Sequence, residues 1–396
     1  MVATLSSRPE DRSGALLTVD LAALAENWRI LKRRADARCD MGAVVKADAY
    51  GLGLEPVART LHAAGCTTFY VAHLDEGLAL RHILGPHLGP NVRIVVMHGP
   101  NPSTERDFAA YKLIPVLSTP AQIKAWRGFA QTNDVLMESL VQIDTGMNRL
   151  GLTAAEFAGL MNDPDGFAGL TPLALMSHLA CAETPAHPLN RLQHERFVSM
   201  LSTFRLKFAD VKGSLANSSG VFLGTGFHFD FARPGAALYG VNPTPGAPNP
   251  MIPVVRLKAK ILQVRRVDAA SPVGYGATFQ APDGAKLATV STGYADGLIR
   301  SWGAGGHAYV DDIRVAVAGR VSMDLTTFDV SNVPESALGP GAVVDILGSR
   351  QTVDDLAKES GTIGYEILTA LGGRYHRRYL PAPAAVNSGT RSNVRS

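Results

Sequence analysis

The stretch Val44-Val45-Lys46-Ala47-Asp48-Ala49-Tyr50-Gly51-Leu52-Gly53 starts as an apolar segment and passes through a lysine into a glycine-containing turn, after which a helical pattern starts at Glu55. This order predicts a strand whose last residue is a lysine. A lysine amine is unreactive at its ordinary pKa of about 10.4, but beside other cations at a pocket mouth it can form an imine or act as a base. A single lysine after a strand is most often a surface residue, so the rest of the chain has to decide its role.

Short apolar segments recur along the first 240 residues, and helical patterns separate most of them. About eight such strand–helix units predict an α/β fold, an N-terminal (β/α)8 TIM barrel. A further strand at 16–19 precedes this series, and Asp20 is expected to cap the helix that follows it. The expected strands of the barrel are 42–46, 69–72, 92–97, 113–117, 140–143, 173–177, 213–216 and 232–238, and the expected helices include 21–37, 76–84, 120–129, 154–161 and 189–206.

Polar residues follow several of these strands. Lys46 follows the first, 144–149 the fifth, His178 the sixth, 217–220 the seventh, and 233–235 lies in the eighth unit. The active-site residues of such barrels lie at the C-terminal ends of the strands. The sequence therefore predicts that these polar residues meet on one rim.

The composition of the sequence changes at the proline-rich segment 242–250, which has no helical period. We expect a domain boundary there, with the barrel at 14–241, a C-terminal mainly β domain at 251–380, and flexible tails at 1–13 and 381–396. The strands expected in the second domain are 254–267, 287–292, 313–318, 326–330 and 342–347, followed by helices at 353–358 and 364–371.

The composition excludes several classes of protein. The 396 residues are 46% hydrophobic with a formal net charge of +3, which describes a globular protein and gives no reason to expect a nucleic-acid partner. The N-terminus lacks the apolar core of a secretory signal, and no apolar run suggests a membrane span. Three cysteines without C-x-x-C spacing indicate neither a disulfide framework nor a metal site. We expect a cytoplasmic protein with no membrane partner.

An ordered set of motifs covering roughly residues 14 to 380 resembles alanine racemases, the pyridoxal-phosphate enzymes of bacterial D-alanine supply, which contribute to peptidoglycan precursors. Each motif alone is weak, but the ordered set is specific. The motifs are Val44–Gly51, Ile143-Asp144-Thr145-Gly146-Met147-Asn148-Arg149-Leu150-Gly151, Ser177-His178, Asn217-Ser218, Arg233-Pro234-Gly235, Gly274–Ala277, Gly293–Gly297, Ser322-Met323-Asp324 and Thr362–Glu366.

The resemblance implies an isomerase that inverts alanine with two bases on opposite faces of the substrate. By resemblance, Lys46 binds pyridoxal 5'-phosphate covalently and is one base, and Tyr275 of the partner subunit in a homodimer with shared active sites is the other. His178 supports that tyrosine and contacts Arg233, which faces the pyridine nitrogen. An arginine stays protonated, so it should not readily protonate the ring, which limits side reactions such as transamination.

The remaining implied roles concern the cofactor phosphate, the substrate and the approach to the site. Hydroxyls and backbone N–H groups can surround a phosphate dianion. The resemblance assigns the phosphate to Tyr50, Ser218, Gly235, Ala236 and Tyr365, the substrate carboxylate and cofactor phenolic oxygen to Arg149, a partner-subunit backbone contact with substrate to Met323, and the entryway to Tyr294, Arg300, Arg320 and Glu183.

Two positions depart from the family pattern. Gln142 stands where a carbamylated lysine often orients the active-site arginine, so we expect Arg149 to be held less firmly or by an anion, and turnover not to require bicarbonate. Ser322 stands where a cysteine is common, so this position should not react with thiol reagents.

Other functions stay open on the sequence alone. A broad-specificity amino-acid racemase would share all these motifs. A non-catalytic pyridoxal-phosphate carrier would lack the second domain and Tyr275. A related decarboxylase usually has a cysteine motif in its C-terminal domain, and this chain has no cysteine after Cys181. A barrel aldolase usually places its lysine on a later strand.

Overall fold

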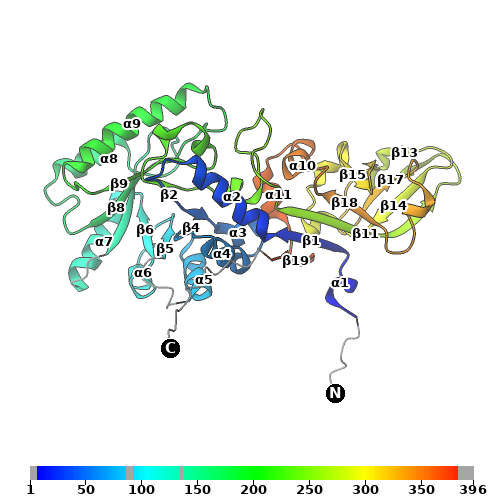
Figure 1. The fold of residues 1–396 in the computed structure, drawn as a ribbon, viewed down its shortest axis with the longest axis horizontal. Coiled ribbons are helices and arrows are strands. Elements are labelled where there is room, and N and C mark those ends of the chain that lie inside the picture. The colour runs from blue at the N-terminus through cyan, green and yellow to red at the C-terminus, as the bar shows by residue number, and fades with distance from the viewer. Residues whose placement is uncertain (1–6, 86–91, 134–136, 382–396) are drawn as a thin grey trace, which may run out of the picture.

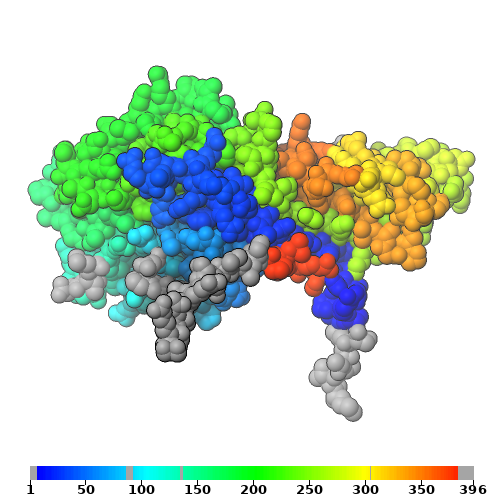
Figure 2. Space-filling model, viewed as in Figure 1, coloured from blue at the N-terminus to red at the C-terminus, as the bar shows by residue number. Residues whose placement is uncertain are grey.

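The computed structural model describes residues 7–85, 92–133 and 137–381. The chain forms two lobes along the long axis of the molecule, an α/β lobe and a mainly β lobe (Figures 1 and 2). Most of the buried apolar side chains of both lobes belong to one continuous core. Within the described residues, no helix combines the length and the apolar character needed to cross a membrane.

The α/β lobe is a barrel of short parallel strands. Seven strands hydrogen-bond in chain order, from β3 to β9, and every neighbouring pair is parallel. The four residues of β4 and of β6 are all buried, as expected for strands covered on both faces. The strands are β3 (Ala43–Val44), β4 (Thr68–Val71), β5 (Arg93–Val96), β6 (Ile114–Leu117), β7 (Glu138–Gln142), β8 (Thr171–Met176) and β9 (Lys212–Ser214).

Strand β10 (Phe231–Ala232) completes the ring by pairing in parallel with β2 (Asp40–Met41), directly before β3. The Gly42 N–H donates to Ala232 O at 3.0 Å, and the Asp230 N–H donates to Gly213 O at 3.0 Å beside β9. The predicted barrel class is confirmed. The predicted strand 232–238 is too long, because Pro234 has no N–H for a ladder and the 3₁₀ helix η3 (Ala236–Tyr239) follows it.

Helices cover the outside of this barrel (Figure 1). Side-chain caps fix some of their starts: Asp20 accepts from the Ala23 N–H at the start of α2, and Thr153 accepts from the Glu156 N–H at the start of α8. The helices are α2 (Leu21–Arg34), α4 (Leu54–Ala63), α5 (Leu74–Leu84), α6 (Glu105–Ala110), α7 (Pro120–Asn133), α8 (Ala154–Asn162) and α9 (Pro188–Arg205).

The second lobe is a closed β structure. Its strand order is β14-β17-β16-β15-β18-β11, and β11 (Val255–Arg266) also pairs with β14, which closes the ring. All five strands predicted here and both helices are confirmed, whereas β15, β19 and the two hairpin strands β12 and β13 were not predicted. The elements are β14 (Lys286–Val290), β15 (His307–Val310), β16 (Ile313–Val317), β17 (Thr326–Asp329), β18 (Val343–Leu347), β19 (His376–Leu380), α10 (Val353–Ser360) and α11 (Gly364–Ala370), with a small hairpin of β12 (Ser271–Val273) and β13 (Phe279–Ala281).

Strand β1 (Ala15–Asp20), which lies within the range expected for the barrel domain, joins the sheet of the second lobe. It pairs antiparallel with β11 and parallel with β19. Its residues alternate between buried and half-buried, because one face of the strand packs on the core. The two lobes are therefore linked by strand pairing near the start and the end of the described chain as well as by the segment 242–250.

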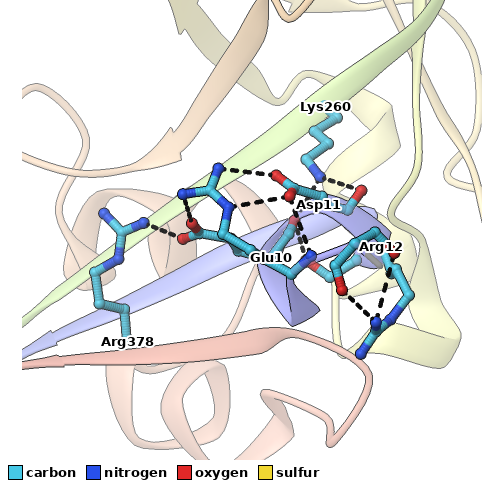
Figure 3. A network of polar contacts seen from close by, with 8 residues as sticks. Glu10, Asp11, Arg12, Lys260 and Arg378 are labelled. Atoms are coloured by element: carbon cyan, nitrogen blue, oxygen red, sulfur yellow. Dashed lines mark hydrogen bonds and ion pairs between the residues drawn. The ribbon is translucent and has the colours of Figure 1, made fainter. Parts of the chain in front are cut away.

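A short helix, α1 (Pro9–Arg12), precedes β1 and is tied to the second lobe by polar contacts (Figure 3). Arg378 on β19 forms an ion pair with Glu10 at 2.6 Å, and the Lys260 amine on β11 donates to Glu10 O at 2.6 Å and to Asp11 O at 3.0 Å. This ordered start differs from the flexible tail expected for residues 1–13. Residues 1–6 and 382–396 lie outside the described residues.

Candidate active site

A cavity of about 720 Å³ opens at the C-terminal ends of the barrel strands. Its volume falls in the range of about 300–1,000 Å³ that is typical of small-molecule sites. The structure brings together in its lining all nine residues that the sequence assigns to a cofactor: Lys46, Tyr50, Arg149, His178, Ser218, Arg233, Gly235, Ala236 and Tyr365.

Lys46 enters this cavity from an unusual turn. The four residues Ala47 to Tyr50 all have left-handed backbone angles, with φ between 52° and 57°. Left-handed conformation costs roughly 1–2 kcal/mol for each non-glycine residue, so surrounding contacts must hold the turn. The Arg377 guanidinium on β19 donates to Gly51 O at 3.0 Å, and the Tyr379 hydroxyl donates to Leu52 O at 3.0 Å. The second lobe thus supports the turn that carries Lys46.

The Lys46 amine is half-buried among cationic neighbours. Burial lowers the pKa of Lys46 from its ordinary value, and the positive charge of Arg149 lowers this pKa further, whereas Glu76 raises it. A lower pKa increases the fraction of the neutral, nucleophilic amine at a given pH. This environment suits a lysine that forms an imine or removes a proton.

Arg233, which is buried, and His178, which is half-buried, lie side by side in the cavity wall. Arg233 is 3% exposed and donates to Ser177 O at 2.6 Å and to the Ser214 hydroxyl, and its Nη2 lies 3.5 Å from His178 Nδ1. Burial and the charge of Arg233 lower the pKa of His178 to about 3, and burial lowers the pKa of Arg233 to about 10. Near neutral pH the pair is thus a protonated arginine beside a neutral imidazole.

A hydroxyl-rich corner lies beside this pair. The Ser218 hydroxyl accepts from the Gly235 N–H at 2.9 Å and from the Ala237 N–H at 3.3 Å. Gly235 is required for this packing, because a Cβ there would lie 2.2 Å from the Tyr50 hydroxyl oxygen. The Tyr50 ring packs against the rings of Tyr239 and Tyr365, at 4.7 Å and 6.2 Å between centroids.

These groups fit pyridoxal phosphate on chemical grounds. The hydroxyls of Tyr50, Ser218 and Tyr365 and the nearby backbone N–H groups can face a phosphate, and Lys46 supplies an amine for an aldehyde. The guanidinium of Arg233 has neutral partners in Ser177, Ser214 and His178, so it can face a neutral ring nitrogen.

Gln142 and Arg149 also line the cavity, but no hydrogen bond between their side chains is found within the described residues. The Gln142 amide donates instead to Leu150 O at 3.2 Å, so it fixes the backbone just after Arg149. Asp144 stabilises the same loop by accepting from the N–H groups of Gly146, Met147 and Asn148. The Arg149 side chain itself is exposed in the single chain.

The other predicted site residues do not line this cavity. Tyr275 is 72% exposed and Met323 is 56% exposed, both in the second lobe. Tyr294, Arg300 and Arg320 are exposed in the same lobe. A Cβ at Gly276 would lie 3.0 Å from the Arg320 guanidinium, and Ala295 N–H donates to Met323 O at 2.9 Å, so the loops with Tyr275, Arg320, Met323 and Tyr294 adjoin one another. We call these four residues the distal set. Glu183 is not one of this set; burial raises the pKa of Tyr365 in the cavity, and the charge of Glu183 raises this pKa further.

Sequence reasoning missed several cavity residues. His98 follows β5, and the rule that sites lie at strand ends would have found it. Thr362 and Ile363 directly precede α11, Glu366 and Thr369 lie on it, and only the fold brings them to the barrel.

A barrel with a half-buried lysine in its cavity, a hydroxyl-rich corner and a second β lobe is the arrangement expected of one class of pyridoxal-phosphate enzyme. Models of two protein families match the chain, "Alanine racemase, N-terminal domain" at residues 19–243 and "Alanine racemase, C-terminal domain" at 254–379. The chain belongs to the alanine racemase family, whose members are pyridoxal-phosphate-dependent isomerases.

Individual relatives match over nearly their whole length. The alanine racemase of Rhodospirillum rubrum is 49% identical over 93% of this chain and 97% of its own. A catabolic alanine racemase of Mesorhizobium japonicum is 46% identical over 94% of each chain. A crystal structure of alanine racemase from Bartonella henselae with covalently bound pyridoxal phosphate is 36% identical, with a TM-score of 0.84 over 93% of this chain and all of that one.

Proposed function

We propose that this chain interconverts L-alanine and D-alanine with pyridoxal phosphate in a homodimer, using Lys46 and Tyr275 of the partner subunit as the two bases. One observation carries the proposal. All nine predicted cofactor residues line a single cavity, whereas the predicted second base is exposed outside that lining. A site that needs both is therefore completed between two copies of the chain.

Exposed apolar side chains support this assembly. Ile363 and Leu150 are exposed at the cavity, and Tyr275, Tyr294 and Met323 are exposed in the distal set. Monomeric proteins rarely leave large apolar patches open to water. In a twofold dimer each distal set can cover the other subunit's cavity, because a symmetric interface is made twice.

Pyridoxal phosphate, when bound, supplies the electron sink that makes the substrate α-proton removable. Tyr50, Ser218, Tyr365 and the N–H groups of Gly235 and Ala236 would hold its phosphate, and Arg233 would face its ring nitrogen. Arg149 would bind the substrate carboxylate, with the Met323 backbone N–H of the partner subunit as a second donor.

Lys46 holds or returns the α-proton on one face of the substrate, and the D-enantiomer presents its proton to that face. Its lowered pKa suits this task, since a base works best with a pKa near the working pH.

Tyr275 of the partner subunit serves the opposite face. A phenol has a pKa of about 10, so it needs a hydrogen-bond donor that stabilises its anion. His178 can supply one. An arginine can only donate, so His178 Nδ1 accepts from Arg233 and the proton of the neutral ring lies on Nε2. That Nε2–H is available to the phenolate oxygen.

The finer assignments rest on the same proposal. Tyr294, Arg300 and Arg320 of one subunit, with Glu183 of the other, would narrow the approach to the cavity. The domains would be 14–241 and 251–380, with strand β1 of the first range paired into the sheet of the second lobe.

Three free cysteines, two of them buried, support a reducing cytoplasmic location. Supply of D-alanine for peptidoglycan stays a prediction, because the matching relatives include both catabolic and biosynthetic racemases.

The test follows α-proton exchange in D₂O by NMR. In the variant Tyr275→Phe we expect racemisation to fall by about 10²–10⁴-fold, the usual effect of losing a general base. D-alanine should still exchange its α-proton through Lys46, whereas L-alanine should not. The matched variant Tyr111→Phe changes an exposed tyrosine of the barrel lobe and should behave as wild type.

Loss of exchange from both enantiomers in Tyr275→Phe would contradict the assignment of one base to each face. Failure of the unmodified protein to exchange either enantiomer would contradict the proposed function. Running the unmodified protein on L-serine in parallel measures substrate breadth, and we expect serine to react more slowly than alanine.

A further inference from the structure

Glu76 is the third residue of α5 and its carboxylate reaches outside its own helix. Its Oε2 accepts from the N–H groups of Ala72 and His73 at 2.7 and 3.1 Å, which is a common cap at a helix start. Its Oε1 accepts from the Ala47 N–H at 2.6 Å, 29 residues away in the chain. One carboxylate therefore joins the end of β4 to the residue that follows Lys46.

The Ala47 N–H, which donates to Glu76, lies at the start of the left-handed turn. Ala47 is the first residue of the left-handed turn, with φ of 52°. The later residues of the turn have partners of their own, since Ala49 N–H donates to Val45 O at 3.0 Å and the Asp48 carboxylate accepts from Leu54 N–H at 2.7 Å. Glu76 thus fixes the end of the turn from which the Lys46 side chain projects.

Glu76 also contributes charge. The titratable groups that interact with Lys46 are Arg149 after β7, His98 after β5, His178 after β8, and Glu76. The His73 ring packs edge-on against His98, 4.6 Å between centroids, on the same side. Among these groups Glu76 is the acidic one.

We propose that Glu76 is a positioning residue for Lys46, holding the left-handed turn through Ala47 and supplying the negative charge that opposes the cations around the lysine amine. This inference rests on the proposed role of Lys46 as the residue that binds the cofactor. In this role Glu76 does more than cap the start of α5.

The variant Glu76→Gln distinguishes the two roles, because glutamine also serves in this type of cap. If the glutamine carbonyl oxygen still accepts from the Ala72 and His73 N–H groups, its NH₂ group faces the Ala47 N–H. Two donors then meet, so that hydrogen bond is lost, and the negative charge is lost as well. The matched control is Glu156→Gln, which changes the equivalent cap residue of α8, where Glu156 accepts from the Thr153 N–H at 2.9 Å, outside the cavity lining.

The first readout is the pH titration of the visible absorbance of the holoenzyme, which follows the protonation of the nitrogen that links Lys46 to the cofactor. We expect Glu76→Gln to titrate at lower pH than wild type, because loss of a nearby anion disfavours the protonated form. Glu156→Gln should titrate as wild type. Glu76→Asp, which keeps the charge, should restore the titration.

The second readout is amide hydrogen exchange of the segment 46–54 by mass spectrometry. We expect exchange roughly fivefold faster in Glu76→Gln and in the shorter Glu76→Asp, and no change in Glu156→Gln, since one hydrogen bond is lost at the turn.

Unchanged titration and unchanged exchange in Glu76→Gln would leave Glu76 as a cap alone and overturn the proposal. A loaded wild-type protein in which borohydride reduction leaves the cofactor unattached to Lys46, as shown by peptide mass spectrometry, would instead contradict the role of Lys46. The two failures are therefore distinguishable.

Discussion

At the residue scale, Gln142 changes how the active-site residue Arg149 is held. In the family resemblance this position often carries a charged, carbamylated lysine. Here the neutral amide donates to Leu150 O and fixes the loop backbone, so it brings no negative charge to Arg149. We expect turnover at fixed pH to be independent of added bicarbonate, measured as alanine racemisation in carbonate-free buffer with and without bicarbonate. A bicarbonate-dependent rate would contradict this interpretation.

His178 should leave a signature in the pH dependence of stability. Its pKa is about 3 in the folded protein, below the value of about 6.5 expected for the unfolded chain. Between these pH values only the unfolded chain binds a proton at this site, so its contribution to the free energy of unfolding falls as the pH decreases below about 6.5.

The variant His178→Gln removes this contribution. Between pH 7 and pH 5 the wild type should lose about 2 kcal/mol more stability than the variant, measured by urea unfolding at each pH. An equal loss in the two proteins would show that His178 is not held neutral by Arg233 and burial.

At the scale of elements, the cavity depends on close packing between the turn of Lys46 and the segment before η3. A Cβ at Gly235 would lie 2.2 Å from the Tyr50 hydroxyl oxygen and must displace that side chain. We expect Gly235→Ala to weaken pyridoxal phosphate binding by tenfold or more, measured by fluorescence titration of the apoprotein, with the fold retained by circular dichroism.

The matched control is Gly128→Ala on α7, where a Cβ would meet no atom within 4 Å. Alanine favours a helix over glycine by about 1 kcal/mol, so this variant should bind the cofactor as wild type and unfold at an equal or higher temperature. Equal cofactor binding by both alanine variants would contradict the role given to Gly235.

Periodicity and strand-end polarity predicted the elements far better than their partners. The strand at 16–19 was recognised, but its pairing with β11 and β19 was not, because those strands lie more than 230 residues further along the chain. The left-handed turn could not be predicted from the sequence either. Ala47 to Tyr50 are non-glycine residues whose local preference opposes this conformation, and contacts with distant residues such as Glu76, Arg377 and Tyr379 help to hold it.

The same limit applies to the site. Ordered motifs predicted nine of the residues that line the cavity, since each of the nine follows a barrel strand or opens α11. The resemblance assigned Tyr275 and Met323 to the partner subunit's site, but periodicity and spacing alone could not show that the distal set lies outside the cavity lining of its own chain, because that depends on how the second lobe is placed. The division of one predicted site between a cavity and an exposed face is a property of the whole molecule.

At that scale, the proposed dimer combines Lys46 of one subunit with Tyr275 of the partner subunit in each active site. It can be tested with two inactive variants, Lys46→Ala and Tyr275→Phe, by coexpressing them and assaying the mixed dimers for alanine racemisation. In a mixed dimer one site lacks both bases and the other has both intact.

Random pairing makes half of the dimers mixed, so the equimolar mixture should recover about one quarter of wild-type activity. Each variant alone should stay inactive. Recovery near one quarter is the result that the shared site predicts. A mixture as inactive as its two components would contradict it, because the two bases would then have to come from the same chain.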